Sequence, residues 1–287
     1  MANYKIITDS GCDLSSQLLQ QLDLQRVCLT VNIDNQVLED SVDEGIRMIY
    51  EKLRSGVMAS TSAINPDGWA RAIEPVLQEG KDVLVLTFSS GLSTTYQSAV
   101  IAAGELAEAY PQRKIRVVDS LAASLGQGLL LWHMCRKRDE GMSLEELVAW
   151  TEENKFRLAM WFTVDDLGFL KRGGRVSAAT ALVGTMLQIK PVLHVDNEGH
   201  LISMAKARGR KASLDALVKK FEQTAIAGEN DTISICHGDC LEDAEYVAER
   251  LKKEFGVKNV IIGYTGAVIG SHSGPGTMAL FFLASER

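Results

Sequence analysis

Runs of apolar, β-branched residues alternate along most of this chain with stretches in which apolar residues recur every three or four positions. The first pattern predicts buried strands and the second predicts amphipathic helices. Regular alternation of the two predicts an α/β fold with largely parallel sheets. The expected strands are residues 5–8, 27–33, 83–88, 115–118, 159–163, 191–195, 232–237, 260–264 and 277–283.

Three expected helices begin with recognisable capping residues. Ser41 with Glu44, and Ser143 with Glu146, have the spacing of a capping box. Asn65 is an expected N-cap, because Pro66 follows it at the first helical position. The polar helix after Ser143 is long enough to be a crossover, and a new strand follows it. We therefore predict two α/β domains, residues 1–155 and 156–287, with a ligand cleft between them.

Composition and charge exclude several classes of protein. With 46% hydrophobic and 23% charged residues the chain has the make-up of a soluble globular protein. The net charge of −7 argues against a broad nucleic-acid-binding surface. Five cysteines are few and odd in number, so no disulfide framework is implied and a cytoplasmic location is expected. The first residues lack the basic and apolar regions of a signal peptide.

One segment is long enough to be considered as a membrane span. Residues 260–285 contain no Lys, Arg, Asp or Glu over 26 positions, and a span requires about 20. The sequence GSHSGPG in its middle would break a helix, because Gly, Ser and Pro are dense there. Two buried strands around a functional loop explain this segment better, and no stable membrane span is expected.

The turn SSGLSTTYQSA, residues 89–99, carries the first candidate site. It joins an expected strand to an expected helix over 96–110, so backbone N–H groups and the positive end of the helix would face a ligand above it. Ser93 and Thr94 add uncharged donors. Such residues are also common N-caps, but this turn has more hydroxyls than capping requires. Together with Thr61 and Ser62, which precede the helix at Pro66, they predict a cradle for a small anion.

Two further clusters have both a functional and a structural interpretation. His272 is the one titratable group inside GSHSGPG, residues 270–276, where glycines permit close approach of a ligand. It could donate to a carboxylate or phosphate, or be a buried histidine satisfied by backbone. The stretch KRGGR, residues 171–175, could contact phosphate or an acidic partner, or be a solvated loop. The same alternatives hold for KARGRK, residues 206–211.

Missing motifs narrow the chemistry. Cys236, His237 and Cys240 have no second ligand cluster, so no metal site is expected. Fingerprints for dinucleotides, ATP, metalloproteases and α/β-hydrolases are missing, and no cofactor is expected. The turn at 91–95 comes closest to a nucleophile elbow but lacks its last glycine. A hydrolase or acyltransferase using Ser93 and His272 therefore stays open, as does a cleft protein for a sugar phosphate.

Six motifs in order make the chain similar to a known family. They are TDS at 8–10, TS at 61–62, GLSTTYQSA at 91–99, VDS at 118–120, DL at 166–167 with LKRGGR at 170–175, and GSHSGPG at 270–276. Any one of these is weak, but their order over nearly the whole length is specific. The chain resembles the DegV family of fatty-acid-binding proteins, which includes the FakB subunits of bacterial fatty acid kinase.

The resemblance implies a carrier, not a catalyst, that binds a long-chain fatty acid such as palmitate or oleate. The acyl chain would lie in an apolar tunnel, mainly in the C-terminal domain, with the carboxylate between the domains. Thr61 and Ser93 would donate to the carboxylate. A partner kinase would phosphorylate it, and an acyltransferase would receive the product. The remaining residues carried over are Ser62, Thr94, Gly270 and His272 around the carboxylate, and Arg175 and Arg208 for phosphate transfer or partner contact.

The sequence departs from the family pattern at three places near these motifs. Thr94 stands where Gly is usual, the loop after Thr61 is longer, and Ala267 stands where Pro is frequent. These changes could alter chain-length preference or head-group geometry. The run 277–283, with Met186 and Leu187, is the expected tunnel lining. Burial contributes about 0.8 kcal/mol per CH₂, so the polar anchor should set orientation more than affinity.

Overall fold

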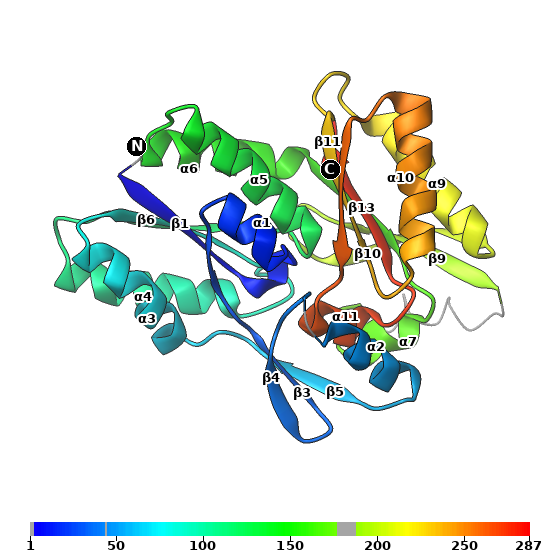
Figure 1. Cartoon of the computed structure of the whole chain (residues 1–287), viewed down its shortest axis with the longest axis horizontal. Coiled ribbons are helices and arrows are strands. Elements are labelled where there is room, and N and C mark those ends of the chain that lie inside the picture. Colours follow the sequence, from blue (N-terminus) through cyan, green and yellow to red (C-terminus); the bar gives the residue numbers. More distant parts are fainter. Residues whose placement is uncertain (1–2, 44, 177–187) are drawn as a thin grey trace.

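The computed structural model describes residues 3–43, 45–176 and 188–287, and it confirms a mixed α/β fold (Figure 1). One sheet has four strands, all parallel to their neighbours, in the order β2-β1-β6-β7. The expectation of parallel pairing is confirmed here. The bounds are β1 Tyr4–Asp9, β2 Gln25–Val27, β6 Asp82–Thr87 and β7 Ile115–Asp119.

The second sheet has six strands in the order β10-β9-β8-β13-β11-β12. Only β11 and β12 run parallel, and the other neighbouring pairs are antiparallel, so the expectation of parallel pairing does not extend to this sheet. The turn between β9 and β10 is short, and a short turn can join antiparallel strands only. The bounds are β8 Leu158–Thr163, β9 Ile189–Val195, β10 Leu201–Arg208, β11 Thr232–His237, β12 Asn259–Tyr264 and β13 Met278–Leu283.

A third, antiparallel sheet of three strands was not expected from the sequence. It consists of β3 (Thr30–Ile33), β4 (Gln36–Glu39) and β5 (Ala59–Ser62), in the order β4-β3-β5. The expected strand 27–33 is thus divided between two sheets. Asp34 and Asn35 both have positive φ, at 54° and 58°, as a two-residue hairpin turn requires. This small sheet matters because β5 carries Thr61.

Two of the three expected helix caps are confirmed. Ser143 and Glu146 form a capping box at α6, and the Asn65 side chain accepts from the Gly68 amide at the start of α3. The box at Ser41 is wrong: the next helix, α2 (Ile46–Arg54), begins later, after Gly45 at φ 79°, and the Ser41 hydroxyl accepts from the Asp43 amide instead. Glu44 lies outside the described residues. The other bounds here are α3 Pro66–Gln78 and α6 Leu144–Asn154.

Helix α5 (Leu125–Asp139) contacts β8, β11 and β13 of the six-stranded sheet and also packs on α6. Its buried side chains join one hydrophobic cluster that draws on both large sheets, for example Leu84 of β6, Leu129 of α5, and Met160 and Phe281 of β8 and β13. This cluster includes residues on both sides of position 155. The domain boundary stays a prediction.

Two further clusters cover the remaining sheet faces. One lies between the four-stranded and three-stranded sheets and the helices α2, α3, α4 (Thr95–Ala109) and α11 (Ala267–Ser273). The other lies under α9 (Arg210–Thr224) and α10 (Leu241–Phe255), which run side by side along the outer face of the six-stranded sheet (Figure 1). The short helices are α1 (Ser16–Gln21), α7 (Leu167–Arg172), η1 (Ser10–Cys12) and η2 (Lys155–Arg157).

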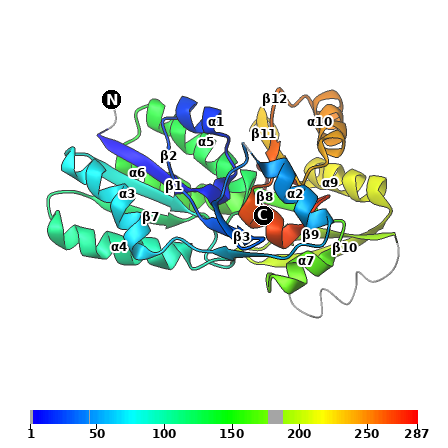
Figure 2. The same ribbon diagram turned by 60° about the horizontal axis from the view of Figure 1, so that its bottom comes forward.

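The uncharged segment 260–285 forms β12, the short helix α11 and β13, as expected of two strands around a loop. Within the described residues, no helix combines the length and hydropathy that crossing a membrane requires. Helix α11 packs against α7, α2 and β5, so segments from both ends of the chain meet around it (Figure 2).

Candidate functional site

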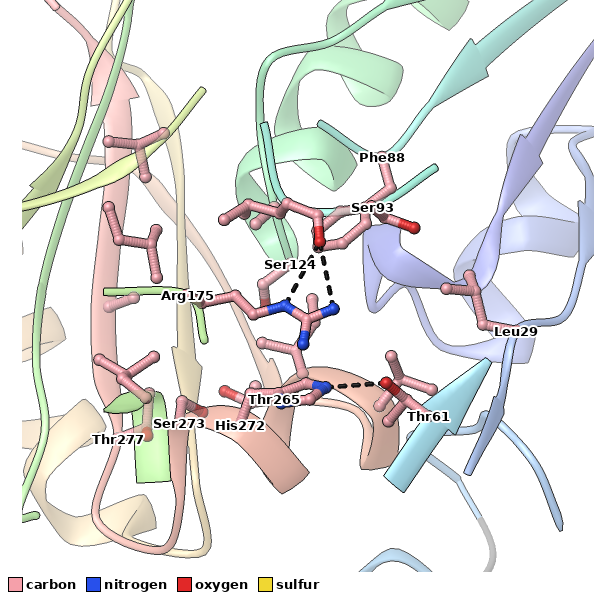
Figure 3. Close-up of a pocket in the computed structure, with 18 of the residues that line it drawn as sticks. Leu29, Thr61, Phe88, Ser93, Ser124, Arg175, Thr265, His272, Ser273 and Thr277 are labelled. Carbon is pink, nitrogen blue, oxygen red and sulfur yellow. Dashed lines mark hydrogen bonds between the residues drawn. The ribbon is translucent and has the colours of Figure 1, made fainter. Parts of the chain in front are cut away.

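A cavity of about 440 Å³ lies where the parallel sheet, the six-stranded sheet and α11 come together (Figure 3). Its volume is within the range of roughly 300–1,000 Å³ that small-molecule sites occupy. Most of its wall is apolar, and nine Ser and Thr residues, one imidazole and one guanidinium supply most of the polar part that the structure describes. The apolar lining includes Leu29, Phe88, Ala123, Met160, Phe162, Leu170, Val195, Leu201, Val268, Ile269, Ala279 and Phe281.

Thr61 and His272 are in direct contact in the polar part of the cavity wall. Thr61 Oγ1 and His272 Nε2 are 2.8 Å apart and share a hydrogen bond, which joins β5 to α11 (Figure 3). Burial, with the positive charge of Arg175 as a second cause, lowers the pKa of His272 to about 4. The imidazole is therefore neutral at physiological pH. The pair can offer a hydrogen bond to an anion without forming an ion pair.

Ser93 lies just before α4, and its hydroxyl is hydrogen-bonded to Thr95, the first residue of that helix. Ser93 Oγ accepts from the Thr95 amide at 3.2 Å and lies 2.8 Å from Thr95 Oγ1. When Thr95 Oγ1 donates, Ser93 keeps its own hydrogen for a ligand in the cavity. Thr94 is the N-cap residue of α4, but its side chain makes no capping bond and lines the cavity instead.

The Ser93–His272 dyad that a hydrolase would need is not formed in this arrangement. His272 Nε2 bonds to Thr61, and the hydroxyl of Ser93 bonds to Thr95. A general base must reach the nucleophile's proton at about 2.6–3.2 Å, although such contacts can tighten on substrate binding. The geometry thus favours two separate donors over an activated nucleophile.

Arg175 places the one guanidinium on the described wall of the cavity. Its Nε and Nη2 lie 3.4 Å from the carbonyl oxygen of Leu92, and its Nη1 donates to the carbonyl of Gly173. Burial lowers the pKa of Arg175, yet an arginine remains a cation in proteins. Within the described residues none of these contacts is to a carboxylate, so the charge is available to an anionic ligand.

A second, smaller cavity of about 250 Å³ adjoins the first. The two share Thr61, Arg175 and His272, and the smaller one is also lined by Met58 and Arg172. The side chains of Thr61, Arg175 and His272 therefore stand between the two cavities. A ligand whose polar group contacts them in the larger cavity would lie next to the smaller cavity.

The structure brings together six of the eight predicted site residues. Thr61, Ser62, Ser93, Thr94, Arg175 and His272 all line the larger cavity. Gly270 does not: it lies on the side of α11 that faces α2, where a Cβ would meet the ring of Tyr50 at 3.0 Å. Its position gives it a packing role. Arg208 also lies outside the cavity, exposed at the end of β10.

The apolar wall follows the alternation of strand β13. Ala279 and Phe281 line the cavity, as does Thr277 just before the strand. Met278, Leu280 and Phe282 point the other way, into the cluster under α9 and α10. Of the predicted run 277–283, the residues on the cavity wall are thus Thr277, Ala279 and Phe281. Met186 and Leu187, also predicted as lining, lie outside the described residues.

Sequence reasoning missed Met160 and Phe162 of β8 and the pair Val195 and Leu201 of the next hairpin. Strand β8 is buried along its whole length, so its sequence shows no alternation that would mark one face as a cavity wall.

The glycine pair of the KRGGR motif offers a test of the site geometry. Gly173 packs against His272 so closely that a Cβ there would collide with Nδ1 of the imidazole. We expect Gly173→Ala to displace His272 and break its hydrogen bond to Thr61. Imidazole ¹⁵N NMR would detect this as a changed Nε2 shift.

Gly174→Ala is the matched control, because Gly174 has φ +71° but open space at its Cβ. It should cost backbone strain of about 1 kcal/mol and leave the His272 spectrum unchanged. A wild-type His272 spectrum in Gly173→Ala would contradict the packing role of Gly173.

Comparisons with known proteins agree with this fold and cavity. A DegV domain-containing protein of Clostridium perfringens is 44% identical over 289 residues, covering 100% of this chain and 99% of its own. A DegV family protein from Thermus thermophilus, described as binding fatty acid, superposes with a TM-score of 0.88 at 33% identity, covering 98% of this chain and 99% of the other. The fatty acid kinase B3 protein of Streptococcus pneumoniae, solved loaded with linoleic acid, gives 0.84 at 25% identity and 99% coverage of both chains.

A family model described as an uncharacterised protein of the DegV family matches residues 3–285, nearly the whole chain. Together with the relative that is 44% identical over its full length, this match is decisive. The chain belongs to the DegV family.

Proposed function

We propose that this protein binds a long-chain fatty acid, such as palmitate or oleate, and presents its carboxylate to a partner enzyme. The observation that carries the proposal is the cavity, whose wall is mostly apolar and whose polar side chains include Thr61, Ser93, His272 and Arg175. A fatty acid has the matching division into one anionic group and a long apolar chain. Structural neighbours that bind fatty acids add support.

The head group is proposed to meet uncharged hydroxyls first. Thr61 and Ser93 would donate to the carboxylate, while Ser62, Thr94 and His272 complete its surroundings. Arg175 would supply the positive charge. Among the described residues its guanidinium hydrogen-bonds to the backbone carbonyls of Leu92 and Gly173 and to no carboxylate, so turning toward an anion would break no ion pair with them. The chain would lie along Met160, Phe162, Ala279 and Phe281.

We further propose that the partner is a fatty acid kinase and that the product, an acyl phosphate, passes to an acyltransferase. The likeness to a fatty acid kinase B protein supports this step. We propose that a phosphoryl donor would approach the carboxylate from the adjoining smaller cavity, which shares Arg175 with the larger one. The exposed Arg208 is proposed as a contact for the partner. The protein itself acts as the carrier.

Native mass spectrometry of gently purified protein tests the ligand directly. We expect a non-covalent mass equal to that of a long-chain fatty acid, released on denaturation. A fluorescent fatty acid should then be displaced by palmitate or oleate. A covalent acyl adduct on Ser93 would instead indicate a hydrolase or acyltransferase, and binding of a sugar phosphate without fatty acid would indicate a polar-anion cleft. Either result would overturn the proposal.

A further inference from the structure

Two buried carboxylates lie at the start of α11, the helix whose other end carries His272. Asp13 follows η1 and is 2% exposed, and Asp40 follows β4 and is 1% exposed. They lie in different loops, and both approach the same point of the chain, Gly266. None of the motifs described above uses this pair.

The contacts of the pair join α11 to the rest of the fold. Asp40 Oδ1 accepts from the Val268 amide at 2.9 Å. Asp13 Oδ2 accepts from the hydroxyl of Ser124, which lines the cavity. A Cβ at Gly266 would collide with Asp13 Oδ1 and lie 3.1 Å from Asp40 Oδ1. Both carboxylates therefore press against the first residues of the helix.

Each carboxylate also has one poorly partnered oxygen. Asp13 Oδ1 and Asp40 Oδ2 are buried and make no hydrogen bond of standard geometry with the described residues, although the backbone of Gly266 and Ala267 and the hydroxyl of Ser10 lie near enough to the two carboxyls to lower their pKa values. A buried polar atom without a good partner is costly, and two ionised carboxylates that face the same residue, Gly266, repel each other. One proton held by the pair removes one charge and supplies a donor for an orphaned oxygen.

We propose that Asp13 and Asp40 hold one proton between them and thereby position α11 and its His272. With the proton bound, the pair fixes the helix start. Without it, the carboxylates repel and the start of α11 loosens. Because α11 has seven residues, His272 lies little more than one turn away from Val268. The consequence for ligand binding rests on the proposed function.

The pair and the neighbouring Asp9 are the groups around the start of α11 whose pKa values are raised toward neutral pH. Burial raises the pKa of Asp40 to about 6, and burial together with repulsion by Asp40 raises that of Asp13 well above its usual range. Burial raises the pKa values of the nearby cysteines and tyrosine, so these stay neutral. The titratable and charged groups facing the pair are Asp9, Cys12, Arg26, Cys28, Tyr50 and Cys236.

The direction of the pH effect follows from linkage. Between the unfolded carboxyl pKa of about 4 and the raised folded value, the native protein binds more protons than the unfolded chain. Stability therefore falls as the pH rises through this window, and levels off above it. Asp9, whose pKa burial raises to about 7, contributes with the same sign. Only the difference between wild type and a variant isolates the pair.

Hydrogen exchange at the amides of α11 tests the proposal in the full-length protein. After correction for intrinsic rates, we expect the wild-type amides of residues 268–272 to exchange at least tenfold faster at pH 8 than at pH 6. Asp13→Asn removes one charge and keeps the shape of the side chain, so its corrected rates should be equal at both pH values. Asp40→Asn serves as a second variant if Asp13→Asn fails to fold. The exposed Asp43→Asn is the control and should behave as wild type.

Displacement of a fluorescent fatty acid by palmitate, at the same two pH values, tests the coupling to the site. Wild-type affinity should fall about tenfold from pH 6 to pH 8, and Asp13→Asn should remove that fall. Unchanged pH dependence of exchange in both asparagine variants would overturn the shared proton, as would slowed exchange at pH 8 on adding Ca²⁺ or Mg²⁺, which would assign the pair to a cation. If exchange behaves as expected but affinity is flat, the coupling to His272 is wrong. If no fatty acid binds at any pH, the proposed function fails while the exchange result still judges the pair.

Discussion

Ala279→Trp is expected to weaken fatty-acid binding by about 200-fold or more while leaving the protein folded. Ala279 lies on β13 in the middle of the cavity wall, with Cys236 and Phe162, two further lining residues, as its cross-strand partners. An indole at this position projects into the cavity. Excluding even four methylenes of an acyl chain would forfeit about 3 kcal/mol of transfer free energy, which corresponds to roughly 200-fold in affinity.

Leu280→Ala is the matched control, because Leu280 is the next residue of the same strand and faces the cluster under α9 and α10. Leu280→Ala should lower the free energy of unfolding by about 2–5 kcal/mol, because it leaves a void in the hydrophobic cluster. Affinity for the fatty acid should be unchanged, because that void lies on the opposite face of the sheet from the ligand cavity. Displacement titrations and urea unfolding of both variants would separate the two effects. Full affinity in a folded Ala279→Trp protein would mean that the acyl chain lies elsewhere.

The parallel strands that alternate with helices could be predicted from the sequence. The exposed strands could not, because their sequences lack a clear apolar pattern. The parallel strands β1, β6 and β7 are buried runs with helices between them, so periodicity located them. Strand β10 is largely exposed and carries Lys206 and Arg208, so nothing apolar marked it as a strand. Its pairing with β9 is what makes the second sheet antiparallel there.

In the candidate site, too, features set by neighbouring residues could be predicted, and contacts between residues far apart in the sequence could not. The hydroxyls of Ser93 and Thr94 were evident because a strand-to-helix turn has a recognisable local pattern. The contact of Thr61 with His272 joins residues 211 positions apart, and no periodicity in either segment indicates it. Each of the two residues was a candidate on its own local pattern, and only the family resemblance placed both around one carboxylate. Asp13 and Asp40 were missed for a related reason: each is an ordinary turn residue until the fold brings both to Gly266.

The double variant Thr61→Val with Ser93→Ala is expected to affect presentation of the carboxylate more than affinity for the fatty acid. Both hydroxyl donors are lost, but Arg175 and the apolar wall remain, so affinity should fall only about tenfold, or about 1.4 kcal/mol. The rate of phosphoryl transfer should fall more than the affinity does, because a displacement of the carboxylate by about 1 Å can lower a reaction rate on the order of 100-fold. We therefore expect phosphorylation of the bound fatty acid by a fatty acid kinase to fall about 100-fold.

Carboxyl-¹³C palmitate gives a readout of head-group position that needs no kinase. Its carboxyl resonance should shift in the double variant and stay near the wild-type position in Thr61→Ser with Ser93→Thr, which keeps both hydroxyls. Ser93→Ala also removes the acceptor for the Thr95 amide, so a stability loss of about 1 kcal/mol at the start of α4 is expected in the double variant. Unchanged resonance and phosphorylation in that variant would show that the two hydroxyls do not hold the carboxylate. Arg175 would then be the remaining candidate for that role, because it is the cation on the described wall of the same cavity.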